Sequence, residues 1–118
     1  LYQIAENHFT SEAQAIAEIE AMGWRAFAMD LVSPESEDLH WHDFGAVTCV
    51  VSGTLRIADG DGVVREFGPG TRIQTGAGFL HREFGGGAFR VVFGFASDPK
   101  EFTKPLNKPP ELLATFNA

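Results

Sequence analysis

Two histidines separated by one residue stand at the start of the most strand-like stretch of this chain. His40 and His42 open the stretch 39–53, LHWHDFGAVTCVVSG, whose apolar and β-branched residues continue to Gly53. Alternate residues of a strand point to the same face of a sheet, so both imidazoles are expected to face one space. The stretch therefore predicts a buried strand that carries two imidazoles at its mouth.

A second glycine-rich stretch brings in a third histidine. Residues 70–85 read GTRIQTGAGFLHREFG and place His81 among four glycines. Neutral imidazole is the commonest side-chain ligand for transition metals in proteins. The two stretches together predict a three-imidazole metal site, His40, His42 and His81, inside a β-barrel. The fourth histidine, His8, has no neighbour at ligand spacing and is expected to face solvent.

The first stretch resembles the first motif of the cupin family, G-x5-H-x-H-x3or4-E-x6-G. His40, His42 and Gly53 stand at the matching places, whereas Pro34 occupies the place of the leading glycine. The glutamate of the motif, which would supply a negative charge to the metal, is replaced by Ala46. The chain is thus similar to a small single-domain cupin in which the first-motif glutamate is missing.

The second stretch resembles the second cupin motif, G-x5-P-x-G-x2-H-x3-N. Gly70, Gly78 and His81 match it, whereas Gly76 and Gly85 replace the proline and the asparagine. The resemblance implies an all-β fold, a cupin-type β-barrel or double-stranded jelly roll, with a divalent metal near its middle. It does not imply one activity, because cupins include dioxygenases, isomerases, decarboxylases, sugar-binding regulatory domains and storage proteins.

The remaining patterns predict one cupin-like domain, residues 1–118, with its barrel core over residues 24–97. Apolar residues at helical spacing predict one N-terminal helix over residues 11–22, which Gly23 ends. The proline-rich tail, residues 98–118, cannot lie inside a sheet because proline lacks a backbone N–H. The prediction is therefore a β-barrel with one helix before it and an irregular tail after it.

Shorter patterns suggest how the strands connect. Residues 1–9 are expected to form an arm or a short edge strand. Residues 46–52 and 54–58 are expected to pair as a hairpin around Gly53. In residues 88–96, every second residue is aromatic or apolar and would face the same side of a strand. This pattern predicts a core strand or a dimer interface rather than a cofactor site.

Composition excludes several classes of partner. The chain has 118 residues, 44% of them hydrophobic, which fits one globular domain. A net charge of −7 and the absence of a basic run argue against nucleic acid and anionic membranes. The single cysteine, Cys49, has no partner for an internal disulfide, so we expect a cytoplasmic protein. Eleven phenylalanines in so short a chain predict a homodimer that covers part of them.

Strand alternation predicts the side chains around the metal. The predicted substrate pocket contains residues on the face of His42 and one from the glycine-rich bend: Phe44, Ala46, Thr48, Val50 and Phe79. Glu83 shares the face of His81 and is the candidate catalytic residue, as a general base or a fourth ligand. The alternative is that Glu83 pairs with Arg82, Arg90 or solvent at the rim.

The predicted site leaves two classes of function open. Three neutral ligands suit one divalent transition metal, Fe, Zn, Ni or Cu, and leave coordination positions open. The first class is a dioxygenase-like or isomerase-like enzyme that acts on a small organic molecule. The second is a noncatalytic domain that binds a small ligand. Because Ala46 leaves the metal without the usual negative charge, a small anionic chelator is the expected ligand.

Overall fold

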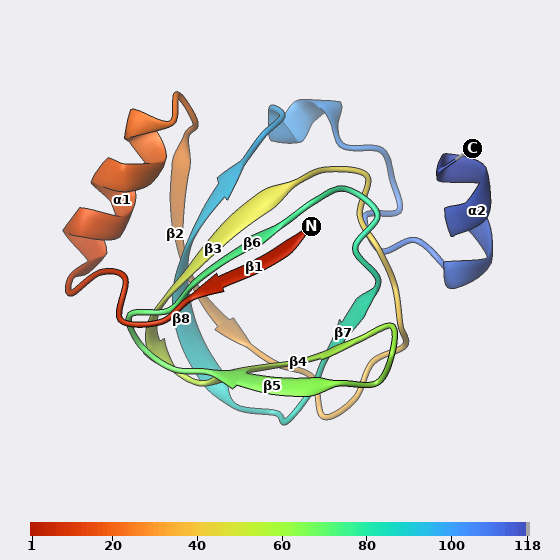
Figure 1. Cartoon of the computed structure of the whole chain (residues 1–118), viewed down its shortest axis with the longest axis horizontal. Helices are drawn as coiled ribbons and strands as arrows, with labels where there is room; N and C mark the ends of the chain where they lie inside the picture. Colours follow the sequence, from red (N-terminus) through yellow and green to blue (C-terminus); the bar gives the residue numbers. More distant parts are fainter. Residues whose placement is uncertain (118) are drawn as a thin grey trace.

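The computed structural model describes residues 1–117, and two antiparallel β-sheets form most of it (Figure 1). The larger sheet has five strands, in the order β1 (Tyr2–Ala5), β6 (Arg72–Thr75), β3 (Ala46–Gly53), β8 (Ala88–Phe95) and β2 (Ala26–Val32). The smaller sheet has the order β5 (Val64–Phe67), β4 (Leu55–Asp59) and β7 (His81–Glu83). The sheets face each other as a barrel of the jelly-roll kind, which confirms the predicted all-β fold class.

Strand alternation divides the larger sheet between two hydrophobic clusters. Inward-facing side chains of β3 and β8 pack with β4, β5 and β6 inside the barrel: Val50, Leu55, Ile57, Phe67, Ile73, Phe89 and Val91. Outward-facing side chains of the same two strands pack against the N-terminal region: Phe9, Ala15, Ile19, Val47, Cys49 and Val92. The larger sheet is therefore apolar on both faces, which explains the near-continuous apolar run in β3.

The predicted N-terminal helix is present as α1 (Glu12–Ala21) and lies outside the larger sheet, against β2, β3 and β8 (Figure 1). The Ser11 hydroxyl accepts the Gln14 N–H at 3.1 Å, as an N-cap should. Gly94 of β8 permits the contact, because a side chain there would meet Ile19 at 2.6 Å. The helix thus covers the outer face of the sheet and leaves the barrel interior free.

The predicted hairpin between β3 and β4 is wrong. β3 pairs with β6 and β8, whereas β4 pairs with β5 and β7 in the other sheet. A β-bulge between Val50 and Ser52 precedes Gly53, whose φ is +76°. A Cβ at Gly53 would lie 2.4 Å from the Ala88 carbonyl oxygen. The chain therefore crosses from one sheet to the other at Gly53, where the left-handed backbone and the missing side chain let β8 pack closely.

The two ends of the chain extend the barrel in different ways. The N-terminal segment adds β1 as an edge strand beside β6, one of the two predicted alternatives. The tail contains the turns η1 (Pro99–Glu101) and η2 (Pro110–Leu112) and the short helix α2 (Leu113–Phe116). It returns along the side of the barrel that carries the loop between β2 and β3 (Figure 1). Neither helix is long and apolar enough to cross a membrane in the described part of the chain.

Candidate metal centre

Backbone pairing brings the predicted histidines together. His40, in the loop between β2 and β3, forms an isolated antiparallel bridge with His81, the first residue of β7. The backbone N–H of each donates to the carbonyl of the other at 2.9 Å. His42 follows, and its carbonyl accepts the Gly78 N–H at 2.8 Å. One ring nitrogen from each of the three histidines lies within 4.8 Å of the others.

Each of the three rings is held through Nδ1 by a backbone carbonyl. Nδ1 lies 2.9 Å from the Asp38 oxygen in His40, from the Leu106 oxygen in His42 and from the Phe79 oxygen in His81. A carbonyl only accepts, so Nδ1 carries a proton, and in a neutral imidazole Nε2 then keeps its lone pair. Three neutral imidazoles with free Nε2 atoms are a donor set that fits a divalent transition metal.

Burial keeps the rings of His42 and His81 in the neutral form that binds metal. His40 and His81 are only 7% and 8% exposed. Burial, with smaller contributions from the other two histidines, lowers the pKa of His81 to about 4. Burial lowers the pKa of His42 too, although the Leu106 carbonyl opposes the shift. The rings of His42 and His81 are therefore neutral at pH 7, as metal ligation requires.

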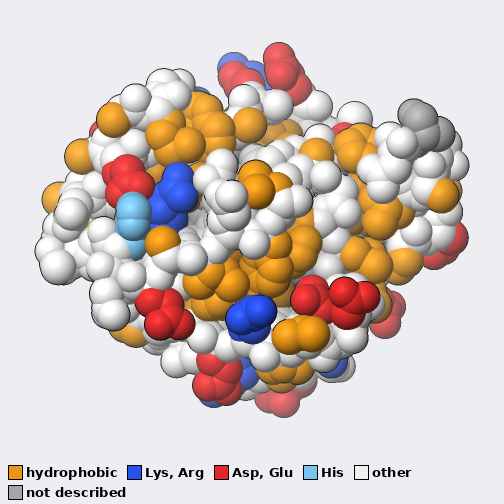
Figure 2. Space-filling model, viewed as in Figure 1, with side chains coloured by type: hydrophobic (Ala, Val, Ile, Leu, Met, Phe, Trp, Pro, Cys, Tyr) orange, Lys and Arg blue, Asp and Glu red, His pale blue; other side chains and the backbone are white. Residues whose placement is uncertain are grey.

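A cavity of about 200 Å³ lies inside the barrel next to His42 and His81. Apolar and aromatic side chains form most of its wall: Phe44, Ala46, Leu55, Ile57, Ile73, Phe79, Phe89, Phe93 and Phe95. Thr48 and Thr75 add two hydroxyl groups, and Glu83 adds the one carboxylate. Figure 2 shows apolar side chains gathered over the barrel interior, between β1 and β4. The cavity suits a small, largely apolar molecule.

The structure revises the predicted wall of this cavity in two places. Val50 does not line it; this fully buried side chain belongs to the hydrophobic cluster inside the barrel. Phe89, Phe93 and Phe95 of β8 do line it, although their alternation predicted a core or dimer face. The periodicity identified the face of the strand, but only the curvature of the sheet decides that this face surrounds a cavity.

Glu83 lies in the cavity wall, as its alternation with His81 predicts. Burial, and secondly the charge of Glu37, raises the pKa of Glu83 to about 7. The alternative partners are engaged elsewhere: Arg82 lies over the Phe84 ring, and Arg90 binds Glu12 and Asp30. Within residues 1–117, no basic side chain forms an ion pair with Glu83.

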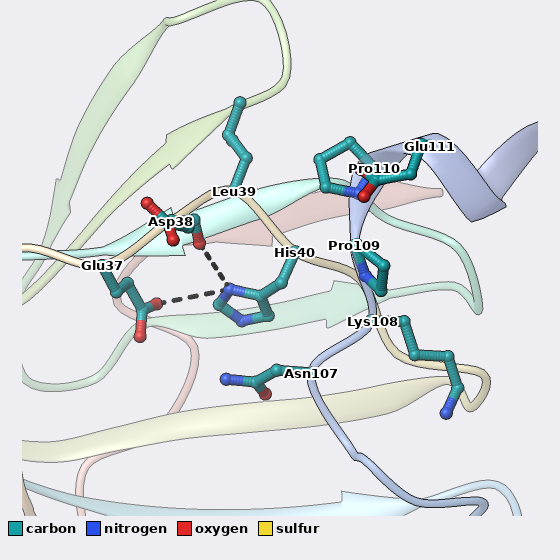
Figure 3. A pocket seen from close by; sticks show the side chains of 9 residues that line it. All are labelled: Glu37, Asp38, Leu39, His40, Asn107, Lys108, Pro109, Pro110 and Glu111. Carbon is teal, nitrogen blue, oxygen red and sulfur yellow. Dashed lines mark hydrogen bonds and ion pairs between the residues drawn. The ribbon is translucent and has the colours of Figure 1, made fainter.

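A second hollow, more open and about 550 Å³ in volume, lies beside His40, which does not line the first cavity. The loop before His40 forms one wall and the C-terminal tail forms the other: Glu37, Asp38, Leu39, Asn107, Lys108, Pro109, Pro110 and Glu111. Figure 3 shows the His40 ring between Glu37 and Asn107. His40 therefore lines a hollow beside the tail, whereas His42 and His81 line the cavity inside the barrel.

Comparisons with known proteins identify the fold. No protein-family model matches the sequence, and no curated protein matches it. Among solved structures, a DUF861 family protein from Thermotoga maritima has a TM-score of 0.53 at 14% identity, over 79% of this chain and 97% of that one. Protein NMB1881 from Neisseria meningitidis has a TM-score of 0.51 at 16% identity, over 61% and 74%.

The third similar structure is an enzyme. The polyketide cyclase RemF from Streptomyces resistomycificus has a TM-score of 0.52 at 23% identity, over 78% of this chain and 68% of that one. All three are cupin-fold proteins, and identities this low establish the architecture only. Together with the two antiparallel sheets and the buried histidine cluster, they show that this chain has the cupin fold.

Proposed function

We propose that this protein is a metal-dependent enzyme that acts on a small organic molecule, with one divalent transition metal held by His40, His42 and His81. The observation that carries the proposal is the hydrogen bond that each of the three rings makes through Nδ1 to a backbone carbonyl. Each Nδ1 is occupied by a carbonyl, which leaves each Nε2 free, and two of the three rings, His42 and His81, line a cavity that can hold a small molecule. A metal with open positions there would act as a Lewis acid toward an oxygen or sulfur ligand.

The composition of the cavity supports an anionic chelator with an apolar remainder as the substrate class. Ala46 lines the cavity at the place of the cupin-motif glutamate, so no carboxylate from β3 competes for the metal. The substrate would supply that negative charge itself, as a carboxylate, thiolate or enediol-like group. Its apolar part would lie against the aromatic side chains Phe44, Phe79 and Phe93.

The position of Glu83 favours proton transfer over oxygenation. Its carboxylate faces the same cavity as His42 and His81 and has no basic partner within residues 1–117. A carboxylate in that position can remove a proton from a bound molecule and return it to another atom, as isomerisation requires. RemF, whose fold is similar to that of this chain, is a polyketide cyclase and therefore an enzyme. Dioxygenase-like chemistry is the second candidate, supported by the three-histidine donor set.

Phenylpyruvate, an enolisable and anionic chelator with an aromatic ring, tests this proposal. In D₂O, zinc- or iron-loaded protein is expected to accelerate deuterium incorporation beside the keto group, as measured by NMR against buffer with free metal. Ala46→Glu should keep the metal but slow the exchange about 10-fold or more, because the new carboxylate competes for the open position. Ala46→Ser is the control and should resemble the wild type.

Three results would contradict parts of the proposal. Equal rates with Ala46→Glu and Ala46→Ser would mean that the substrate does not use an open position on the metal. Oxygen consumption without deuterium incorporation would replace isomerase-like with dioxygenase-like chemistry. The alternative function, a noncatalytic small-ligand binding domain, would be favoured if metal-loaded protein binds phenylpyruvate but accelerates neither deuterium incorporation nor oxygen consumption.

We also propose that two copies of the chain associate through the free edge of β2. Within the described residues β2 pairs only with β8, and it exposes Met29 by 43% and Val32 by 71%. Pairing of two such edges would cover both side chains and satisfy unpaired backbone groups. Light scattering is expected to give twice the 12.8 kDa chain mass, whereas a constant monomer mass at all concentrations would exclude the dimer.

A further inference from the structure

The part of the C-terminal tail that follows η1, residues 102–110, lies against the segment that carries His42. We call residues 102–110 the C-terminal strap. Figure 3 shows residues 107–110 of the strap opposite the loop that leads into His40. The strap contains no strand and only the first residue of η2, so its position depends on contacts with the rest of the molecule.

The strap is bound along four consecutive residues of the histidine-bearing segment. Trp41 and Lys108 exchange two backbone hydrogen bonds, of 3.1 and 2.9 Å. The Trp41 indole N–H donates to the Pro109 carbonyl at 2.8 Å, and this indole is only 3% exposed. The Asp43 carboxylate accepts a hydrogen bond from the Thr103 hydroxyl. The strap is therefore hydrogen-bonded on both sides of His42, by three bonds with Trp41 and one with Asp43.

His42 differs from the other two histidines in what holds its ring. The Nδ1 atoms of His40 and His81 donate to carbonyls two residues earlier in their own segments. Nδ1 of His42 donates instead to the Leu106 carbonyl of the strap, 64 residues away in the sequence. His42 is also the only one of the three that is not fully buried. Its tautomer and orientation therefore depend on the strap.

Aromatic stacking links the strap to the same ring. The His42 ring stacks on Phe44, with centroids 5.1 Å apart and an angle of 13° between the planes. Phe44 in turn stacks on Phe102 of the strap, at 3.7 Å and 9°. One face of the His42 ring thus rests on a two-ring stack that ends in the strap, while its Nδ1 rests on a strap carbonyl.

We propose that the C-terminal strap is a functional part of the metal site, because its Leu106 carbonyl positions His42 for ligation. Docking of the strap and binding of the metal then stabilise each other, and each must strengthen the other by the same factor. The inference rests on the proposed metal site. It adds that His42 is oriented as a metal ligand only when residues 102–110 are docked, so that the strap controls metal affinity.

Lys108 offers a variant that loosens the Leu106 carbonyl without touching a histidine. Its ammonium donates to the Thr103 carbonyl at 3.0 Å and to the Pro105 carbonyl at 2.7 Å, which braces the peptides on the N-terminal side of Leu106. Lys108→Met keeps an unbranched apolar side chain that is one atom shorter, and it removes these bonds. Zinc affinity, measured by calorimetry, is expected to fall about 10-fold, as for other groups that orient a ligand. Lys100→Met is the matched control and should bind zinc like the wild type, because the Lys100 side chain makes no such bond within residues 1–117.

Hydrogen exchange of the unmodified protein provides the reciprocal measurement. The Lys108 amide, which donates to the Trp41 carbonyl, is expected to exchange about 10-fold more slowly when zinc is bound. The Gly23 amide, which donates to the Glu20 carbonyl at the end of α1, outside the barrel, should exchange at the same rate with and without zinc. A purely structural tail would not show this metal-dependent difference between the two amides.

The possible results separate this inference from the proposed function. Wild-type protein that binds no zinc would overturn the metal site and the inference together. Wild-type protein that binds zinc, with equal affinity for Lys108→Met and unchanged Lys108 exchange, would overturn the role of the strap and leave the metal site intact. A lower zinc affinity in Lys108→Met but not in Lys100→Met, together with slower exchange of the Lys108 amide when zinc is bound, supports the strap as part of the site.

Discussion

Replacing His81 with alanine is expected to lower zinc affinity by about 100-fold or more. A structural zinc site with four protein ligands contributes about 10–16 kcal/mol, so one ligand is worth roughly 3 kcal/mol. The β fold should remain, because the bridge between His40 and His81 uses backbone groups and not the ring. Zinc binding by calorimetry and far-UV circular dichroism of the same sample measure both expectations.

His8→Ala is the matched control for this loss. His8 lies outside the cluster and its Nε2 contacts Glu18 at 2.7 Å, so its removal should leave zinc binding unchanged. Wild-type protein is expected to bind close to one zinc ion per chain. Equal losses in His8→Ala and His81→Ala would show that zinc binds elsewhere, and equal affinity in His81→Ala and the wild type would exclude this ligand set.

Gly53→Ala is expected to reduce the free energy of unfolding by more than about 3 kcal/mol. The backbone at residue 53 has a φ of +76°, which costs a residue with a side chain about 1–2 kcal/mol. The new Cβ would also lie 2.4 Å from the Ala88 carbonyl oxygen and 2.8 Å from the Phe89 Cα. These are backbone atoms in the central pairing of β3 with β8, so relief requires that the sheet itself moves.

Gly62→Ala separates the two contributions. Gly62 has a similar φ of +80°, but apart from its two chain neighbours no residue within 1–117 has an atom within 4 Å of the position of its Cβ. The substitution should therefore cost only the backbone strain, about 1–2 kcal/mol. Urea unfolding of both variants measures the difference. If Gly53→Ala is no less stable than Gly62→Ala, the corner between the two sheets is not packed as the structure has it.

The sequence by itself determined the features that depend on neighbouring residues. Alternation along β3 and β7 placed Ala46, Thr48 and Glu83 on the face of the histidines, and the structure has them in one cavity wall. Helical spacing between Ser11 and Gly23 determined α1. The spacing within each glycine-rich stretch also indicated His40, His42 and His81 as a ligand set. Backbone geometry repeats over a few residues, so patterns of this length can be read without knowledge of the rest of the chain.

Only the tertiary structure decided the features that depend on distant segments. Gly53 reads as a hairpin turn from its neighbours, but the approach of β8 makes it a corner between sheets. The Phe93 face of β8 reads as core, and the curvature of the barrel makes it a cavity wall. The contact between His42 and Leu106 spans 64 residues and uses a backbone carbonyl, a group that every residue has. Such a contact has no sequence signal, because it arises from the path of the folded chain and not from the type of side chain.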